Sequence, residues 1–313
     1  MAQQWRAETW GAPSTWTFAE VTTRPPGAGE VTITVAAAGV NPVDYKQVAA
    51  PAPGREFPVL IGNEVSGTLA AIGPDTEIAS GQGAVGDPVV AFRISGGYAT
   101  EITVPAKDVF AKPSRLSHEE AANLLLVGTT AAQMLDSVQV RAGDTILLHG
   151  ASGAVGVSVL QQAAEMGVRV IGTASESSFA RIRRFGGTPV AYGPELLSQI
   201  NEALDGSVLA AALDAVGTDE AIDISLELVP DRNKIVTVVN APRAAAQGFR
   251  GLFGNQPESL RFRDEIRPRL LALAESGRLQ VPIARTFPLR HAPDALALVA
   301  TGHAGGKIAL TAG

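Results

Sequence analysis

The chain has 313 residues, a length that favours two domains over a single hydrophobic core. Hydrophobic residues make up 46% and charged residues 18%, which is typical of a compact globular protein, and no apolar run reaches the roughly 18 residues of a membrane helix. The formal net charge of -6 excludes a general attraction to nucleic acid, and the absence of cysteine excludes disulfides and thiolate metal ligands.

The N-terminus reads Met-Ala-Gln-Gln-Trp-Arg-Ala and lacks the apolar core of a signal peptide. We therefore expect a cytoplasmic protein with a small-molecule partner, and no nucleic acid or membrane partner.

Residues 1 to about 118 have the composition of β-strands separated by Gly, Pro and Asp. Frequent turn signals and little helical periodicity predict a folded-over β-barrel with short connections. The strands expected are residues 5–9, 30–36, 64–72, 88–92 and 98–104.

The periodicity becomes helical near residue 117. Ser117, followed three positions later by Glu120, forms a capping-box pattern that opens an apolar helix reaching about Val127. A second helix is expected over residues 130–139. The change of period predicts a domain boundary near residue 118.

A glycine-rich turn follows the apolar run 145–149, which has the character of a strand buried on both faces. The turn reads Ala151-x-Gly153-x-x-Gly156, with alanine where the dinucleotide fingerprint usually has its first glycine. Residues 157–166 then have helical spacing. Free N–H groups and the helix dipole at such a turn favour a pyrophosphate, and the alternative is an ordinary strand-to-helix turn.

Strands and helices alternate beyond this turn, which predicts a parallel sheet with helices on both faces. The expected strands are residues 168–173, 189–192, 208–215 and 234–239, and the expected helices are residues 179–185, 195–204 and 219–228. Further along, the pattern predicts a loop over 241–256, helices over 258–277 and 292–300, and a strand over 307–311.

Seven motifs occur in a characteristic order, in residues 37–46, 57–67, 96–99, 127–131, 149–156, 213–217 and 306–310. With them the chain resembles the medium-chain dehydrogenase/reductase superfamily, and within it the zinc-free quinone oxidoreductases of the zeta-crystallin type. The resemblance implies an α/β fold. It places a Rossmann-type, NADP-binding doubly wound sheet in residues 119–259, and a GroES-like β-barrel catalytic domain in residues 1–118, completed by about 260–313.

Zinc-dependent members of this superfamily hold a catalytic metal with cysteine and histidine. By similarity the three ligand positions fall on Asn41, Asn63 and about Val127, and Glu64 alone keeps a carboxylate. Catalytic zinc needs three protein donors of the Cys, His or carboxylate kind. The sequence therefore predicts no metal.

The end of the second sheet strand decides between NAD and NADP, because a carboxylate there accepts the ribose hydroxyls of NAD. That position reads Ser175, and Glu176 comes one residue late. A carboxylate facing the ribose would exclude a 2'-phosphate, whereas Ser175, the bases within residues 181–184 and Tyr192 favour it. A helix cannot point all three arginines at one ligand, and we take Arg181 as the phosphate contact.

The resemblance and the glycine turn together define the candidate site. Cofactor contacts are expected from Thr130, Ala151, Ser152, Gly153, Ala154, Val155, Gly156, Ser175, Arg181, Tyr192, Val216, Val239 and Asn240. Tyr45 is the candidate donor to the substrate carbonyl oxygen, with Asn41 as the orienting group. A packed aromatic side chain is the alternative role for Tyr45. Asp44 is expected to hold the local turn, and a role as an acid is its alternative. We expect His149 to be a neutral structural residue.

These features predict an NADPH-dependent reductase of quinones or α,β-unsaturated carbonyl compounds. An enoyl-thioester reductase is an alternative within the same superfamily. The other alternative is a non-enzymic NADPH-binding protein with a structural or RNA-linked role, against which the acidic charge argues. Relatives often form homodimers, so a homodimer is expected.

Overall fold

The structure is a computed structural model that describes residues 1–312. The chain divides into two compact units, the first formed by Met1–Leu126 and the segment from Gln280 onward, the second by Val127–Leu279. The division differs from the domain boundaries expected near residues 118 and 260, because the helical segment before Leu279 packs within the second unit. None of the helices in residues 1–312 combines the length and apolar character that a membrane span requires.

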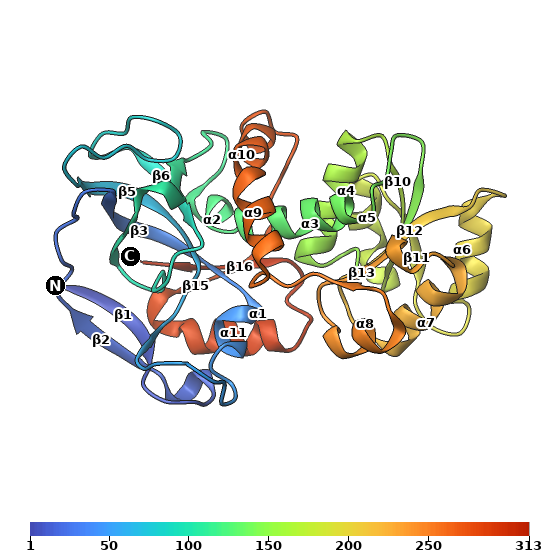
Figure 1. Cartoon of the computed structure of the whole chain (residues 1–313), viewed down its shortest axis with the longest axis horizontal. Coiled ribbons are helices and arrows are strands. Elements are labelled where there is room, and N and C mark those ends of the chain that lie inside the picture. The colour runs from blue at the N-terminus through green and yellow to red at the C-terminus, as the bar shows by residue number, and fades with distance from the viewer. Residues whose placement is uncertain (313) are drawn as a thin grey trace. The chain divides into compact units, whose positions relative to one another are not determined.

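The first unit is built on a seven-stranded sheet in the order β15-β16-β3-β5-β6-β8, with β7 also paired to β3. Figure 1 labels five of these strands, β3, β5, β6, β15 and β16. Its strands are β3 (Glu30–Val40), β5 (Glu64–Ile72), β6 (Pro88–Phe92), β7 (Glu101–Pro105), β8 (Val109–Ala111), β15 (Ile283–Pro288) and β16 (Lys307–Thr311). A smaller sheet has the order β2-β1-β4, formed by β2 (Thr17–Val21), β1 (Ala2–Ala7) and β4 (Val59–Leu60). These strands form the GroES-like part of the predicted fold.

Two short helices, α1 (Pro42–Lys46) and α2 (His118–Ala121), and the longer α11 (Ala292–Ala300) accompany these sheets, and α3 (Leu125–Ser137) begins at the end of this unit. The predicted capping box at α2 is confirmed, since Glu120 N donates to Ser117 Oγ at 3.2 Å and Ser117 N donates to Glu120 Oε2 at 2.9 Å. The last strand, β16, pairs antiparallel with β3, so residues 307–311 lie in the seven-stranded sheet of the first unit.

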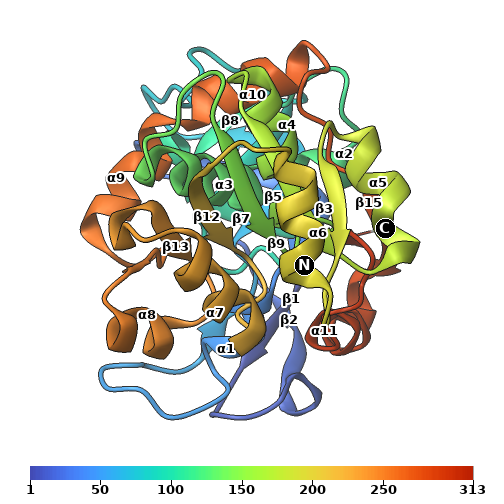
Figure 2. The ribbon, with the colours of Figure 1, turned by 90° about the vertical axis from the view of Figure 1, so that its right-hand side faces the viewer.

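The second unit contains a six-stranded parallel sheet in the order β11-β10-β9-β12-β13-β14, and Figure 2 shows β13, β12 and β9 in this order. Its strands are β9 (Thr145–His149), β10 (Arg169–Ala174), β11 (Thr188–Ala191), β12 (Leu209–Asp214), β13 (Ile235–Thr237) and β14 (Arg250–Gly251). The predicted Rossmann-type sheet is thus confirmed.

Helices cover both faces of this sheet. One apolar core joins the sheet to α3, α4 (Ala154–Glu165) and α5 (Phe179–Arg184). A second core on the other face joins it to α6 (Leu196–Leu204), α7 (Asp219–Leu228) and α8 (Ala241–Gln247). Alternate strand residues enter the two cores, because successive side chains of a strand point to opposite faces.

The loop predicted over residues 241–256 is wrong, because the segment contains α8 and β14. Asn240 caps α8 by accepting from Arg243 N at 3.1 Å, and Gly248, at φ 70°, ends it. Pro242 lies in the first turn, where proline is tolerated. The helix predicted over 258–277 is two helices, α9 (Pro257–Glu265) and α10 (Arg267–Glu275), because Pro268 lacks the N–H that would continue the first helix.

Candidate functional site

The glycine-rich turn joins β9 to α4 in the second unit. Gly150 adopts a φ of 75°, which favours glycine, and Gly153 is the N-cap of α4. Gly153 N donates to Gly150 O at 3.1 Å, and Ala151 N donates to Thr173 O at 3.1 Å on the neighbouring strand. The first N–H groups of α4, which follow at once, have no acceptor within the helix, so the turn presents donors to an anion.

Close packing explains the small residues in this turn. A Cβ atom on Gly156 would lie 2.3 Å from Gly150 O, so only glycine fits. Ala151 is fully buried, and a Cβ on Gly172 of β10 would lie 2.6 Å from the Ala151 Cβ. The alanine at the first fingerprint position is therefore accommodated by a glycine on the next strand. With its small residues and the free N–H groups of α4, the turn over residues 150–156 fits a dinucleotide diphosphate.

Of the three arginines of α5, Arg181 contacts the glycine turn. Its Nη1 donates to Ser152 O at 3.3 Å. Arg183 and Arg184 are exposed and lie over the rings of Phe179 and Phe185, 5.6 Å and 5.2 Å from the ring centroids. The structure thus separates one arginine beside the turn from two on the helix surface.

Serine hydroxyls gather where β10 ends. Ser175 Oγ lies 3.0 Å from Ser177 Oγ and 3.3 Å from Ser178 Oγ, while Glu176 between them is exposed. This segment therefore offers hydroxyl groups near the end of the strand, where NAD-binding proteins usually have a carboxylate.

Exposed apolar side chains follow the carboxyl ends of three strands in the same unit. Tyr192 after β11 is 58% exposed, Val216 after β12 is 44% exposed and Val239 after β13 is 43% exposed. Asn240 Nδ2 donates to Gly217 O at 2.9 Å and so joins the turns after β12 and β13. Ligands of doubly wound sheets bind at this edge, so these residues form an apolar surface where a dinucleotide is expected.

The first unit contains a buried ionic cluster around Asn41. Lys307 Nζ donates to Asn41 Oδ1 at 2.6 Å and to Glu64 Oε1 at 3.3 Å, and Asn41 Nδ2 donates to the same Glu64 oxygen at 2.9 Å. Glu64 Oε2 accepts from Leu126 N at 3.0 Å. Lys307, Asn41 and Glu64 are 5%, 1% and 0% exposed, so this is an internal ion pair with its polar atoms satisfied.

Asp44 extends this cluster. Its carboxylate accepts from Asn41 N at 2.8 Å, Tyr98 Oη at 2.8 Å and Asn63 Nδ2 at 2.5 Å. Complete burial raises the pKa of Asp44 to about 6, although these hydrogen bonds pull it down. The expected role of Asp44 in holding the local turn matches its bond to Asn41 N. Tyr98 and Lys307 were not predicted as site residues, because they reach this cluster from positions 54 and 266 residues away from Asp44 and Asn41.

Two further predicted site residues are Tyr45 in the first unit and Thr130 in the second unit. Tyr45 is half-buried in α1 and packs against the hydrophobic core of the first unit. Thr130 is buried within α3, at 6% exposure. Their proposed contacts with substrate and cofactor stay predictions.

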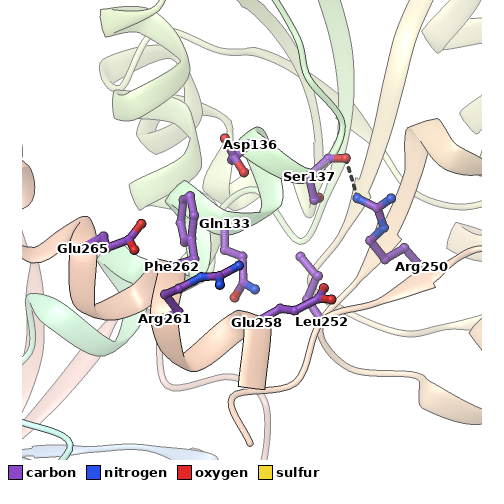
Figure 3. A pocket seen from close by; sticks show the side chains of 9 residues that line it. All are labelled: Gln133, Asp136, Ser137, Arg250, Leu252, Glu258, Arg261, Phe262 and Glu265. Carbon is purple, nitrogen blue, oxygen red and sulfur yellow. Dashed lines mark hydrogen bonds between the residues drawn. The ribbon is translucent and has the colours of Figure 1, made fainter. Parts of the chain in front are cut away.

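A pocket of about 370 Å³ lies elsewhere on the second unit, and none of the predicted site residues lines it (Figure 3). One lining residue, Gln133 of α3, donates to Ser259 Oγ at 2.6 Å and accepts from Arg263 Nε at 2.9 Å, which fixes α9 to α3. Arg250 Nη1 donates to Ser137 O at 2.7 Å, and both residues line the pocket (Figure 3). The lining residues are Gln133, Asp136, Ser137, Arg250, Leu252, Glu258, Arg261, Phe262 and Glu265.

Comparison with known proteins agrees with this architecture. Residues 27–114 match the family of alcohol dehydrogenase GroES-like domains, and residues 187–310 match the zinc-binding dehydrogenase family. The chain is 29% identical over 319 residues to a quinone oxidoreductase of Pseudomonas aeruginosa, with 94% of this chain and 95% of that protein covered. It is 28% identical over 314 residues to a 2-haloacrylate reductase of a Burkholderia species, with 91% of each covered.

Solved structures extend the comparison to a cofactor complex. A mycobacterial protein solved with NADPH has a TM-score of 0.82 and 28% sequence identity, with 100% of both chains covered.

The side chains at the positions that hold zinc in relatives do not fit this metal. Asn41 Oδ1 and Glu64 Oε1 share the ammonium group of Lys307, and Asn63 donates to Asp44. Within residues 1–312, no group of three or more His, Cys, Asp or Glu side chains is arranged to hold a metal ion. The Glu64 carboxylate, which a metal would need as a ligand, is therefore already paired with the ammonium group of Lys307.

Proposed function

The chain belongs to the quinone oxidoreductase-like proteins of the medium-chain dehydrogenase/reductase superfamily, and from this premise we propose that it reduces quinones or α,β-unsaturated carbonyl compounds with NADPH. It is an enzyme of the medium-chain reductase kind and uses a nicotinamide dinucleotide, which sets aside a purely structural role. The proposed reaction needs no catalytic metal, since the donor set around Glu64 does not fit zinc.

The position of Arg181 is the main observation that supports a preference for NADPH over NADH. Its guanidinium donates to Ser152 O in the glycine turn, while Ser175 directly follows β10, where a carboxylate would select NAD. A fixed positive charge and nearby hydroxyl groups favour the 2'-phosphate of NADPH. The mycobacterial relative solved with NADPH supports the same choice.

In this reaction the chain's own residues would hold the cofactor and stabilise the charge that develops on the substrate. Bound NADPH would supply a hydride to the far carbon of an enone or to a quinone ring. The glycine turn and the first turn of α4, from Ala151 to Gly156, would hold the diphosphate, and Val239 and Asn240 would hold the carboxamide. Tyr45 would donate a hydrogen bond to the carbonyl oxygen where negative charge develops. Asn41, held by Lys307 and Glu64, would orient this donor.

The cofactor assignment can be tested by calorimetric titration of NADPH and NADH. We expect wild type to bind NADPH more tightly than NADH. Arg181→Ala should weaken NADPH binding about tenfold and leave NADH binding nearly unchanged, because a charge-assisted bond contributes about 1.5 to 3 kcal/mol. Arg183→Ala is the matched control, since Arg183 lies over Phe179. Equal affinities for the two cofactors in wild type would contradict the assignment.

The substrate class can be tested by NADPH consumption with a panel of quinones, enones and enoyl thioesters. Turnover of quinones or simple enones supports the proposal, and the Burkholderia relative, named for the reduction of a haloacrylate, supports including unsaturated acids. Turnover confined to enoyl thioesters would favour the alternative reductase. The homodimer and the cytoplasmic location stay predictions.

A further inference from the structure

A row of four polar side chains crosses the parallel sheet of the second unit. Thr173 pairs in register with His149, His149 pairs with Asp214, and Asp214 pairs with Thr237. Residues in register on neighbouring strands point to the same face. The four side chains, here called the strand-end ladder, are between 0% and 4% exposed.

At the carboxyl ends of these four strands, the polar ladder residues stand where apolar side chains would continue the core. Two residues earlier, the same four strands carry Leu147, Ile171, Ala212 and Ile235, which belong to the core shared with α6, α7 and α8. Buried polar groups destabilise a fold unless they form hydrogen bonds. The four polar residues at the next level therefore need a reason other than packing.

Each of three ladder residues accepts hydrogen bonds from the turn that follows a strand. Thr173 Oγ1 accepts from Gly150 N at 3.3 Å. Asp214 Oδ1 accepts from Val216 N at 2.9 Å and from Gly217 N at 2.8 Å.

Thr237 holds the third turn and is linked to the second. Its Oγ1 accepts from Val239 N at 3.1 Å and Asn240 N at 3.2 Å, and its hydroxyl donates to Asp214 Oδ2 at 2.6 Å. A shift of one turn would thus be transmitted to the next through a short, buried bond.

His149 completes the row between Thr173 and Asp214. Its Nδ1 lies 3.3 Å from Thr173 Oγ1, and its Nε2 has no hydrogen-bond partner among the described residues. Burial lowers the pKa of His149 to about 4, so the imidazole is neutral near pH 7. The ladder therefore carries one carboxylate, one neutral imidazole and two hydroxyls.

We infer that the strand-end ladder of Thr173, His149, Asp214 and Thr237 is a positioning device that fixes the three turns assigned above to the dinucleotide. These turns contain Ala151, Ser152 and Gly153 after β9, Val216 after β12, and Val239 and Asn240 after β13. The ladder residues act through backbone amides of these turns. The inference rests on the proposed function for the identity of the ligand, and on the hydrogen bonds above for the device itself.

Two variants at one position test the device. Thr237→Val has nearly the shape of threonine but lacks the hydroxyl that accepts from two amides and donates to Asp214. Thr237→Ser keeps that hydroxyl. Ser225→Ala is the matched control, because Ser225 is buried in α7 and donates within its own helix to Ala221 O at 2.7 Å.

The first measurement is amide hydrogen exchange of the free protein, which needs no ligand. We expect Thr237→Val to speed exchange at Val216, Gly217, Val239 and Asn240, and Thr237→Ser and Ser225→Ala to leave these amides protected. Unchanged exchange in Thr237→Val would overturn the inference.

The second measurement is NADPH binding and steady-state kinetics. Thr237→Val should raise both the dissociation constant and the KM for NADPH about tenfold, the equivalent of one hydrogen bond, while kcat changes less and Thr237→Ser restores the wild-type values. Faster exchange without weaker binding would overturn the positioning role. Failure of the wild type to bind either dinucleotide would instead refute the proposed function, with the exchange result still deciding whether the ladder holds the turns.

Discussion

Lys307 brings a positive charge into the interior of the first unit. It lies beside Asn41, which stands at one of the positions that hold zinc ligands in zinc-dependent members of the superfamily. Its ammonium group donates to Val40 O, Asn41 Oδ1 and Glu64 Oε1, so its three donors are satisfied. Removing one partner of such a buried pair leaves the other charge uncompensated. The lysine and the glutamate therefore depend on each other.

We predict that Lys307→Met destabilises the protein by about 3 to 5 kcal/mol, because the Glu64 carboxylate loses its counter-charge. Adding Glu64→Gln should recover part of this loss. Urea unfolding measures both effects, and Lys46→Met, at an exposed lysine of the same unit, is the control. A double variant that is as unstable as the sum of the two single variants would contradict the coupling.

His149 predicts a pH dependence of stability. Burial lowers its pKa from 6.5 to about 4, so the unfolded chain binds a proton in a range where the folded chain does not. The stability contribution of the neutral imidazole is present above pH 6.5 and is lost as the pH falls towards 4. The full loss is on the order of 3 kcal/mol.

The measurement is the free energy of unfolding of wild type and His149→Asn between pH 7 and pH 4. Asp44 acts in the opposite direction in this range, because burial raises its pKa from 3.8 to about 6 and its stabilising contribution is lost as the pH rises. The difference between the two proteins cancels Asp44 and should isolate the histidine. Parallel pH profiles would rule out this role for His149.

Among the elements, the strand-turn-helix unit of β9 and α4 depends on a pair of small residues. Ala151 lies in the turn after β9, and Gly172 lies on the neighbouring strand β10. Ala151 occupies the space that a side chain at position 172 would need, since the two Cβ atoms would be 2.6 Å apart. The departure from the usual dinucleotide fingerprint is thus compensated on β10. Ala151 and Gly172 form a complementary pair.

This pair makes a prediction for a double-mutant cycle. Gly172→Ala alone should destabilise the second unit by about 1 to 3 kcal/mol and weaken NADPH binding, because the added methyl group displaces the turn. Ala151→Gly in the same protein should restore most of both losses. Thermal unfolding and NADPH titration measure the effect. A double variant no better than Gly172→Ala would show that the clash lies elsewhere, for example with Ile182.

For the whole molecule, the donor set around Glu64 predicts independence from zinc. We expect the purified enzyme to contain substoichiometric zinc and to keep its NADPH-dependent activity after prolonged treatment with 1,10-phenanthroline. The reason is that the ammonium of Lys307 already compensates the one carboxylate at the ligand positions. A zinc-dependent alcohol dehydrogenase treated in parallel serves as control. Stoichiometric zinc whose removal abolishes activity would contradict the prediction.

Local sequence signals were sufficient for most elements. The strands at Glu64–Ile72 and Pro88–Phe92 and the helix at Asp219–Leu228 begin and end where they were predicted, because hydrophobic period and capping are read within a few residues. The helix at Ala241–Gln247 was missed although Asn240, Pro242 and Gly248 were its local signals. Tertiary contacts were not needed to find it.

The sequence by itself determined the α/β fold class with its Rossmann-type sheet and the glycine turn with its small residues, because each depends on residue type at short spacing. Only the tertiary structure decided that Arg181 rather than Arg183 contacts the turn, and that His149 and Asp214 lie in one ladder. It also brought Lys307 to Asn41 across 266 positions. Such contacts depend on strand register and chain closure, which couple residues that no local pattern relates.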